Sequence, residues 1–322
     1  MPRSRRLPVV LGMVAISIAA LAAVVAAEDV AIGVGFPHLL RFPGDFSAAY
    51  LRREVSALQA GPAPTIFLGD SVVWGYHLPA EQTAVTLLAA QGCACRNFAF
   101  KAGSPPNYFA LAQLLRAGGV RPKAVVLEIN QRVFNVVDDS YKKLNPAVAA
   151  TAGSLLTPDE RGALVFPPAP GGLQGALDAG VASRWLLYAM RADIRDTLYG
   201  EGEQVPASQP TAEMFLGTYD LTPLNRRNVG VRFLEKTADL FHADGIPVIA
   251  FMTPTNHRLL HDYIDGPEYR ANGEYLRRLM AARGARVLDL DRAFPADEFF
   301  DNDHLTAAGQ RRLAARLAPL LR

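Results

Sequence analysis

The chain has 322 residues, of which 50% are hydrophobic and 20% are charged. This composition is typical of a globular protein with a full core and excludes a disordered chain. The 33 basic and 31 acidic residues nearly cancel, and Arg3, Arg5 and Arg6 supply three of the basic ones. Nucleic-acid binders normally concentrate basic residues on one face, so this balance argues against a nucleic-acid partner.

An uncharged apolar run, residues 7–27, follows these arginines. It is long enough to cross a bilayer as a helix, and the arginines before it would keep its N-terminal end in the cytoplasm. A cleaved secretory signal is the alternative, because the small residues 25–27 offer a cleavage site. The run exceeds the usual apolar core of a signal peptide, so we favour an uncleaved anchor. Either reading places the rest of the chain outside the cytoplasm, at the envelope face of the membrane or secreted.

The chain therefore divides into an anchor or signal segment (1–27), a linker with a lead-in helix (28–63) and a main domain (64–322). Apolar runs within the domain predict five strands, and helical spacing predicts a helix before each strand and one at the end. The predicted strands are residues 65–68, 96–100, 123–129, 246–252 and 285–290. The predicted helices are residues 46–60, 80–91, 107–117, 225–243, 268–282 and 306–321. This alternation predicts an α/β fold with a mostly parallel five-stranded sheet between helices.

The alternation lapses over residues 138–222, where turn-forming residues are frequent. Within this segment, residues 181–199 have helical spacing, with Trp185 and Tyr188 as aromatic anchors. A segment this long between a strand and a helix is more typical of a lid or binding insertion than of a connection. We expect it to determine substrate specificity.

Cys93 and Cys95 are the only two cysteines and are one residue apart. In an oxidising compartment they could form a small-ring disulfide, and two separate thiols are the alternative. No nearby residue supplies further metal ligands, so we assign these cysteines no metal and no catalytic role.

The stretch of residues 65–75, TIFLGDSVVWG, places a serine directly after a buried strand. Gly69 permits a tight turn, and Asp70 and Ser71 suit the start of a helix. A serine at the carboxyl end of a parallel strand lies where open α/β sheets bind ligands, beside backbone N–H groups that can stabilise an oxyanion. Ser71 could instead simply cap the helix, and the triplet alone is a weak signal.

The last loop, FFDNDHLT, contains Asp301 and His304, three residues apart. This spacing lets the carboxylate fold back onto one imidazole nitrogen and leaves the other free to take a proton from a hydroxyl. The loop follows a predicted strand, so it should lie at the same sheet edge as Ser71. Gly103, after the second strand, and Asn130, at the end of the third, belong to that edge too, where an amide and a backbone N–H could form an oxyanion hole.

The order of Ser71, Gly103, Asn130 and then Asp301 with His304, each at a strand end, resembles the SGNH, or GDSL, hydrolase superfamily. The resemblance covers roughly residues 66–315, apart from the insertion. It implies a three-layer flavodoxin-like fold and an ester-hydrolysing activity without a cofactor. It also implies that Ser71 is the nucleophile, His304 the base and Asp301 its orienting acid, with Asn130, Gly103 and the Ser71 amide around the oxyanion.

Three departures from the family pattern stand out. Val72 replaces the expected Leu, Ala99 and Ala102 replace the glycines of the second block, and Glu128 replaces a glycine before Asn130. The anchor and the short tail around His304 look more like the envelope acyl-transfer branches, such as alginate O-acetyltransferases and D-alanyl transfer proteins. That likeness implies acyl esters, foremost acetyl esters, of envelope polysaccharide as substrates, with a membrane-embedded acyl carrier as a partner.

Two other classes remain as alternatives. A non-catalytic glycan-binding protein of the envelope could keep this fold, and the altered glycine block favours it, but a binder has no need for Ser71, Asn130 and the Asp301–His304 pair together. A metal hydrolase is weaker, because His257 and His261 are spaced as ligands without a supporting acid. We expect these two histidines at the rim of the insertion.

Overall fold

The computed structural model describes residues 6–35, 41–44, 46–136, 139–167, 177, 180–181, 185–190, 210–215 and 217–321. Its centre is a five-stranded sheet in the order β2-β1-β3-β4-β5. The strands are β1 (Thr65–Leu68), β2 (Cys95–Asn97), β3 (Ala124–Ile129), β4 (Val248–Met252) and β5 (Arg286–Asp289). Neighbouring strands pair in parallel throughout. The predicted α/β fold with a mostly parallel five-stranded sheet is therefore confirmed.

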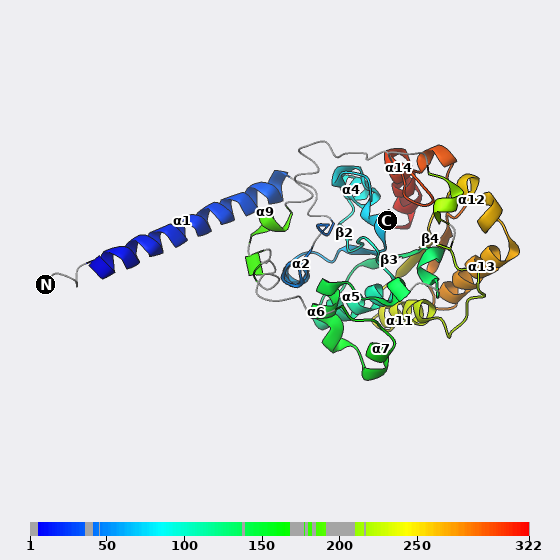
Figure 1. Ribbon diagram of the computed structural model, residues 1–322, viewed down its shortest axis with the longest axis horizontal. Coiled ribbons are helices and arrows are strands. Elements are labelled where there is room, and N and C mark those ends of the chain that lie inside the picture. The colour runs from blue at the N-terminus through cyan, green and yellow to red at the C-terminus, as the bar shows by residue number, and fades with distance from the viewer. Residues whose placement is uncertain are drawn as a thin grey trace.

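Helices cover both faces of the sheet, which gives three layers (Figure 1). α4 (Ala84–Ala90) and α14 (Ala307–Leu317) pack together on one face. The other face is covered by α2 (Ala48–Ala60), α5 (Pro105–Ala117), α11 (Val229–Ala243) and α13 (Pro267–Ala281). Every residue of β1, β3 and β4 is buried, as expected for apolar strands covered on both sides. The edge strand β5 is only half-covered.

The remaining helices are short, apart from the one at the N-terminus. They are α3 (Ser71–Trp74), α6 (Pro146–Ala152), α7 (Pro158–Gly162), α9 (Leu186–Ala189) and α12 (His257–Ile264). The sequence did not predict α12. α1 (Arg6–Gly35) projects from the body as one long helix (Figure 1). Its window Leu11–Glu28 has a mean hydropathy of 2.2 and lies unburied, which is compatible with a single membrane anchor or a signal sequence.

Strand boundaries differ most from prediction at β2, which ends at Asn97 rather than at residue 100. The Asn97 side chain donates to the Val73 carbonyl at 2.9 Å and accepts from the Ala99 N–H at 3.0 Å. These two bonds turn the chain out of the sheet. Cys95, the first residue of β2, is joined to Cys93 in a disulfide.

The first part of the predicted insertion is folded against the body. α6 packs on α2 and α5, and a bridge joins Lys143 to Val165. Further along, α9 lies within residues 181–199, which the sequence predicted to be helical. Residues 182–184 and 191–199 of that segment lie outside the described residues.

Candidate functional site

Ser71 lies where β1 ends and α3 begins. The Asp70 carboxylate accepts a hydrogen bond from the Val72 N–H at 2.9 Å and so caps α3, which ends at Gly75 in the left-handed conformation. This turn holds the Ser71 side chain at the carboxyl edge of the sheet with a relative exposure of 6%. Within the described residues, the Ser71 backbone N–H has no hydrogen-bond partner. It is therefore available to stabilise negative charge.

His304 reaches Ser71 from the loop before α14. Its Nε2 lies 2.8 Å from the Ser71 Oγ, and its Nδ1 lies 2.7 Å from the Asp301 Oδ2. The other oxygen of Asp301 accepts the backbone N–H groups of Asp303 at 3.1 Å and His304 at 2.9 Å. The loop thus folds around the Asp301 carboxylate, and a serine, a histidine and an acid form one continuous chain of hydrogen bonds.

The charges around His304 set its proton affinity. Burial lowers the pKa of His304, but the Asp303 charge and the hydrogen bond to Asp301 outweigh it, so the pKa lies above the ordinary 6.5. Burial raises the pKa of Asp301, but the hydrogen bond and charge of His304 together with two backbone N–H bonds outweigh it, and the pKa falls to about 2. Asp301 is thus ionised at neutral pH and stabilises the imidazolium that forms when His304 takes a proton.

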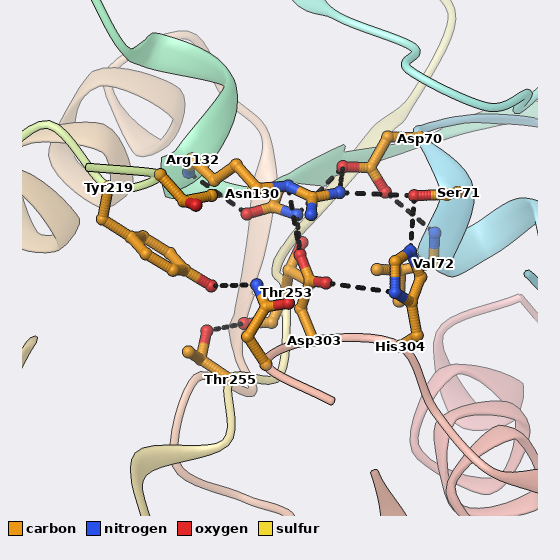
Figure 2. A network of polar contacts seen from close by, with 12 residues as sticks. Asp70, Ser71, Val72, Asn130, Arg132, Tyr219, Thr253, Thr255, Asp303 and His304 are labelled. Atoms are coloured by element: carbon orange, nitrogen blue, oxygen red, sulfur yellow. Dashed lines mark hydrogen bonds and ion pairs between the residues drawn. The ribbon is translucent and has the colours of Figure 1, made fainter. Parts of the chain in front are cut away.

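Arg132 is a part of this site that the sequence did not reveal. It lies on the short 3-10 helix Gln131–Phe134 that follows β3, and its Nη2 lies 3.3 Å from the Ser71 Oγ (Figure 2). The guanidinium also forms ion pairs with Asp70 at 3.5 Å and Asp303 at 3.3 Å. The sequence signal that could have pointed to Arg132 is its position two residues after Asn130, at the end of a strand.

Asn130 is close to Ser71 in the fold, but its amide points elsewhere than predicted. The side-chain N–H groups are donated to the Asp70 Oδ2 at 2.9 Å and the Asp303 Oδ2 at 2.8 Å (Figure 2). Its amide oxygen accepts from the Arg132 N–H at 3.2 Å. The carboxylates of Asp70 and Asp303, which sequence spacing did not connect to Asn130, accept both of its side-chain N–H groups. In this structure Asn130 braces the site and has no amide hydrogen left for an oxyanion.

Gly103 also differs from its expected role as an N–H donor. Its N–H is donated to the Phe100 carbonyl at 3.0 Å. A Cβ at this position would lie 2.3 Å from the Gly69 carbonyl oxygen, so the glycine is needed for close packing against the Ser71 turn. The residue before it, Ala102, has a φ of 59°, and its N–H has no partner within the described residues. Of these two backbone N–H groups, only that of Ala102 is unengaged within the described residues.

Three buried carboxylates, those of Asp70, Glu128 and Asp303, form hydrogen bonds or ion pairs within the site. Glu128 accepts the Asp70 N–H at 2.7 Å and the Thr253 hydroxyl at 2.9 Å. Burial and the nearby Asp70 charge raise the pKa of Glu128 well above its usual value. A Cβ on Gly69 would lie 2.4 Å from Glu128 Oε2, which explains the glycine of the Gly-Asp-Ser turn.

Aromatic rings form the rim of the site. The Tyr76 ring lies 4.8 Å from the His304 ring, and the His77 ring lies 5.6 Å from it. Ligand atoms of His77, Asp301 and His304 lie within 4.8 Å of one another, so the trio has the composition of a metal site. Both ring nitrogens of His304 are already hydrogen-bonded, and a cation could bind only by replacing one of those bonds.

An apolar cavity of about 490 Å³ lies beside this rim and includes Lys101, Leu144 and Phe166 in its lining. The Lys101 Nζ lies 5.1 Å from the Tyr76 ring centroid, which connects the cavity to the rim.

The histidines considered as metal ligands do not converge. The two ring nitrogens of His257 form hydrogen bonds with Asp265 at 2.8 Å and Asp291 at 2.9 Å. His261 instead pairs with its neighbour Asp262. Both lie on α12, which packs against the 3-10 helix Ala212–Phe215 near the end of the insertion.

Comparisons with known proteins find limited similarity. A family model matches residues 226–322, which is less than half of the chain. No curated protein matches the chain. Among solved structures, one from Desulfitobacterium hafniense DCB-2, described as a lipolytic protein of the G-D-S-L family, matches with 9% identity and a TM-score of 0.40. The match covers 80% of this chain and 99% of that one, and similarity at this level does not establish the activity of this chain.

Proposed function

We propose that this protein is a serine-dependent acyl esterase or O-acyltransferase that works through an acyl-enzyme on Ser71. The observation that supports this proposal best is the continuous chain from the Ser71 Oγ to the His304 Nε2 at 2.8 Å and from the His304 Nδ1 to Asp301 at 2.7 Å. A serine is activated as a nucleophile when its hydroxyl is hydrogen-bonded to a base and a third group orients that base. A protein that only binds a ligand has no need for it.

The reaction begins when the Ser71 Oγ attacks the carbonyl carbon of an ester. His304 accepts the hydroxyl proton through Nε2, and the ionised Asp301 holds the imidazole and stabilises its positive charge. The tetrahedral intermediate then collapses, and His304 returns the proton to the leaving alcohol. Water or a sugar hydroxyl repeats the sequence on the acyl-enzyme and releases Ser71.

The developing oxyanion needs donors that are not already engaged. The Ser71 N–H and the Ala102 N–H meet this condition within the described residues. Arg132, with its Nη2 3.3 Å from the Ser71 Oγ, adds a positive charge held in place by Asp70 and Asp303. A preorganised cation beside the reacting oxygen favours the transition state without reorganisation during the reaction.

A covalent probe tests this assignment directly. A serine-directed fluorophosphonate should label the wild-type protein and leave Ser71→Ala unlabelled. Ser154→Ala, which alters an exposed serine, serves as the matched control and should label fully. Equal labelling of wild type and Ser71→Ala would refute the nucleophile.

The substrate we propose is an acyl ester, foremost an acetyl ester, of envelope polysaccharide. The apolar helix α1 supports this choice, because an anchor there would keep the site within reach of the envelope face of the membrane. A membrane-embedded carrier could then deliver the acyl group. Mass spectrometry of envelope glycan from cells with and without the gene tests the proposal. More O-acylation in the deletion indicates an esterase, less indicates a transferase, and no change favours a glycan-binding protein.

A further inference from the structure

The helix α9 contacts α1 near its exit from the body (Figure 1). The indole Nε1 of Trp185, the residue before α9, donates to the Glu28 Oε2 of α1 at 2.8 Å. On its other side, α9 is tied to the body, because Leu186, Ala189 and Met190 are buried in the main core. The catalytic body and the N-terminal helix are thus linked through one short segment.

The depth of this contact follows from helix geometry. The uncharged run 7–27 spans about 32 Å as a helix at ~1.5 Å per residue, close to the ~30 Å hydrocarbon thickness of a bilayer. Glu28 is the first charged residue after the run, so it would lie at the membrane–water boundary. Trp185, bonded to it, would lie at the same depth.

The chemistry around Trp185 suits that depth. Its ring stacks on Tyr188 with centroids 6.2 Å apart, and both residues are half-buried. Leu177 and Val181, eight and four residues before Trp185, have relative exposures of 57% and 38%. Tryptophan and tyrosine are enriched at bilayer interfaces, where an apolar ring and a polar group meet two different environments. Val181 lies beside this pair, because its carbonyl accepts the Trp185 N–H at 2.9 Å. Its exposed apolar side chain would lose contact with water if it faced lipid.

We propose that Leu177, Val181, Trp185 and Tyr188 form an interfacial surface that rests on the lipid bilayer beside the end of α1. The surface belongs to the inserted segment, so the contact sets the height and tilt of the Ser71 site above the membrane. This proposal rests on α1 being an uncleaved anchor, which is part of the localisation argued above. It does not depend on the chemistry at Ser71.

The tryptophan content gives a direct test, because Trp74 and Trp185 are the only two. Trp74 is 5% exposed in the core, so Trp185 is the one near lipid. The full chain is reconstituted into vesicles whose lipids have a nitroxide quencher either near the headgroup or near the chain end. In Trp74→Phe, the emission of Trp185 should be quenched at least about twofold more by the shallow label than by the deep one. In Trp185→Phe, the emission of Trp74 should respond to neither.

Full-chain wild type labelled with 5-fluorotryptophan provides a second measurement if Trp74→Phe fails to fold. It should give two ¹⁹F resonances, and the shallow nitroxide should broaden only the one that is missing in Trp185→Phe. Equal behaviour of the two tryptophans in protein that has inserted into the vesicles would overturn the surface. Protein that stays in solution instead would overturn the anchor and the surface with it. Fluorophosphonate labelling of the same samples reports separately on Ser71.

Discussion

The guanidinium of Arg132 lies beside the Ser71 hydroxyl, with Nη2 3.3 Å from Oγ (Figure 2). It cannot swing freely, because Asp70 and Asp303 hold it at 3.5 Å and 3.3 Å. These carboxylates are in turn bridged by the amide of Asn130. A chain of buried acids therefore fixes a cation beside the Ser71 hydroxyl.

Replacing Arg132 by Gln should lower kcat on a soluble acetyl ester by about 10²–10³-fold, the usual cost of removing one oxyanion donor. KM should change little, because the lost interaction strengthens only in the transition state. Steady-state kinetics measure both constants. A kcat within twofold of wild type would contradict the role.

The same substitution also leaves Asp70 and Asp303 without their counterion. Breaking a buried pair from one side typically costs about 3–5 kcal/mol, so thermal stability should fall as well. Arg132→Lys retains the charge and serves as the control for stability. If Arg132→Lys restores stability but not the full kcat, the planar guanidinium contributes to the reaction beyond its charge.

The pH dependence of activity should report on His304. As the base, His304 must be neutral, and its pKa lies above 6.5 in the folded protein. The kcat/KM should therefore decline as pH falls through a value above 6.5. Asp301→Asn removes one of the two carboxylates that raise this pKa, so this acid limb should move to lower pH while the plateau drops by about 10³–10⁴-fold. A limb that stays in place in Asp301→Asn would show that another group titrates.

Sequence predicted the sheet and the proximity of Ser71, Asp301 and His304 for a physical reason. β1 and β4 are uninterrupted apolar runs, and a strand buried on both faces has no other pattern to show. Asp301 and His304 are three residues apart, so their bond is local and spacing alone could suggest it. Ser71 and His304 meet because parallel strands end at one edge.

Sequence patterns could not predict the polar contacts between residues far apart in the chain. Asn130 reaches Asp303, and Arg132 reaches Ser71, across sequence separations of 173 and 61 residues. Nothing in the local pattern ranks one buried acid over another as the partner of an amide. The missed helix α12 shows a similar limit, because its hydrophobic residues include only two buried positions, Leu260 and Ile264.

Gly103→Ala tests the close approach of two loops at the site. The added Cβ would meet the Gly69 carbonyl oxygen at 2.3 Å, and a backbone atom cannot rotate away. The Ser71 turn would have to shift, with an expected loss of about 1–3 kcal/mol in the free energy of unfolding and a fall in kcat. Gly162→Ala has open space around its Cβ and should change neither. Chemical denaturation and ester kinetics compare the two, and equal stability of both variants would argue against the packing.

Glu128 should make stability depend on pH in the opposite direction from Asp301. Burial and the Asp70 charge raise the pKa of Glu128 well above its ordinary value of 4.5. Below pH 4.5 the folded and unfolded forms are both protonated, and Glu128 adds no pH dependence. As pH rises from 4.5 towards the folded pKa, only the unfolded form ionises, so the free energy of unfolding decreases. Asp301, with a folded pKa of about 2, instead adds stability above its ordinary pKa of 3.8, and this stability is lost as pH falls towards 2.

Glu128→Gln removes this titration and keeps the shape of the side chain. The Gln oxygen can accept the Asp70 N–H, and its amide can donate to the Thr253 hydroxyl, so both existing contacts have a counterpart. The difference in the free energy of unfolding, Glu128→Gln minus wild type, should be constant at about pH 4 and below. It should then grow in favour of the variant as pH rises towards the folded pKa of Glu128, by about 1.4 kcal/mol per unit of pKa shift. Urea denaturation across this range measures the difference. A constant difference would mean that the pKa of Glu128 is not raised in the folded protein.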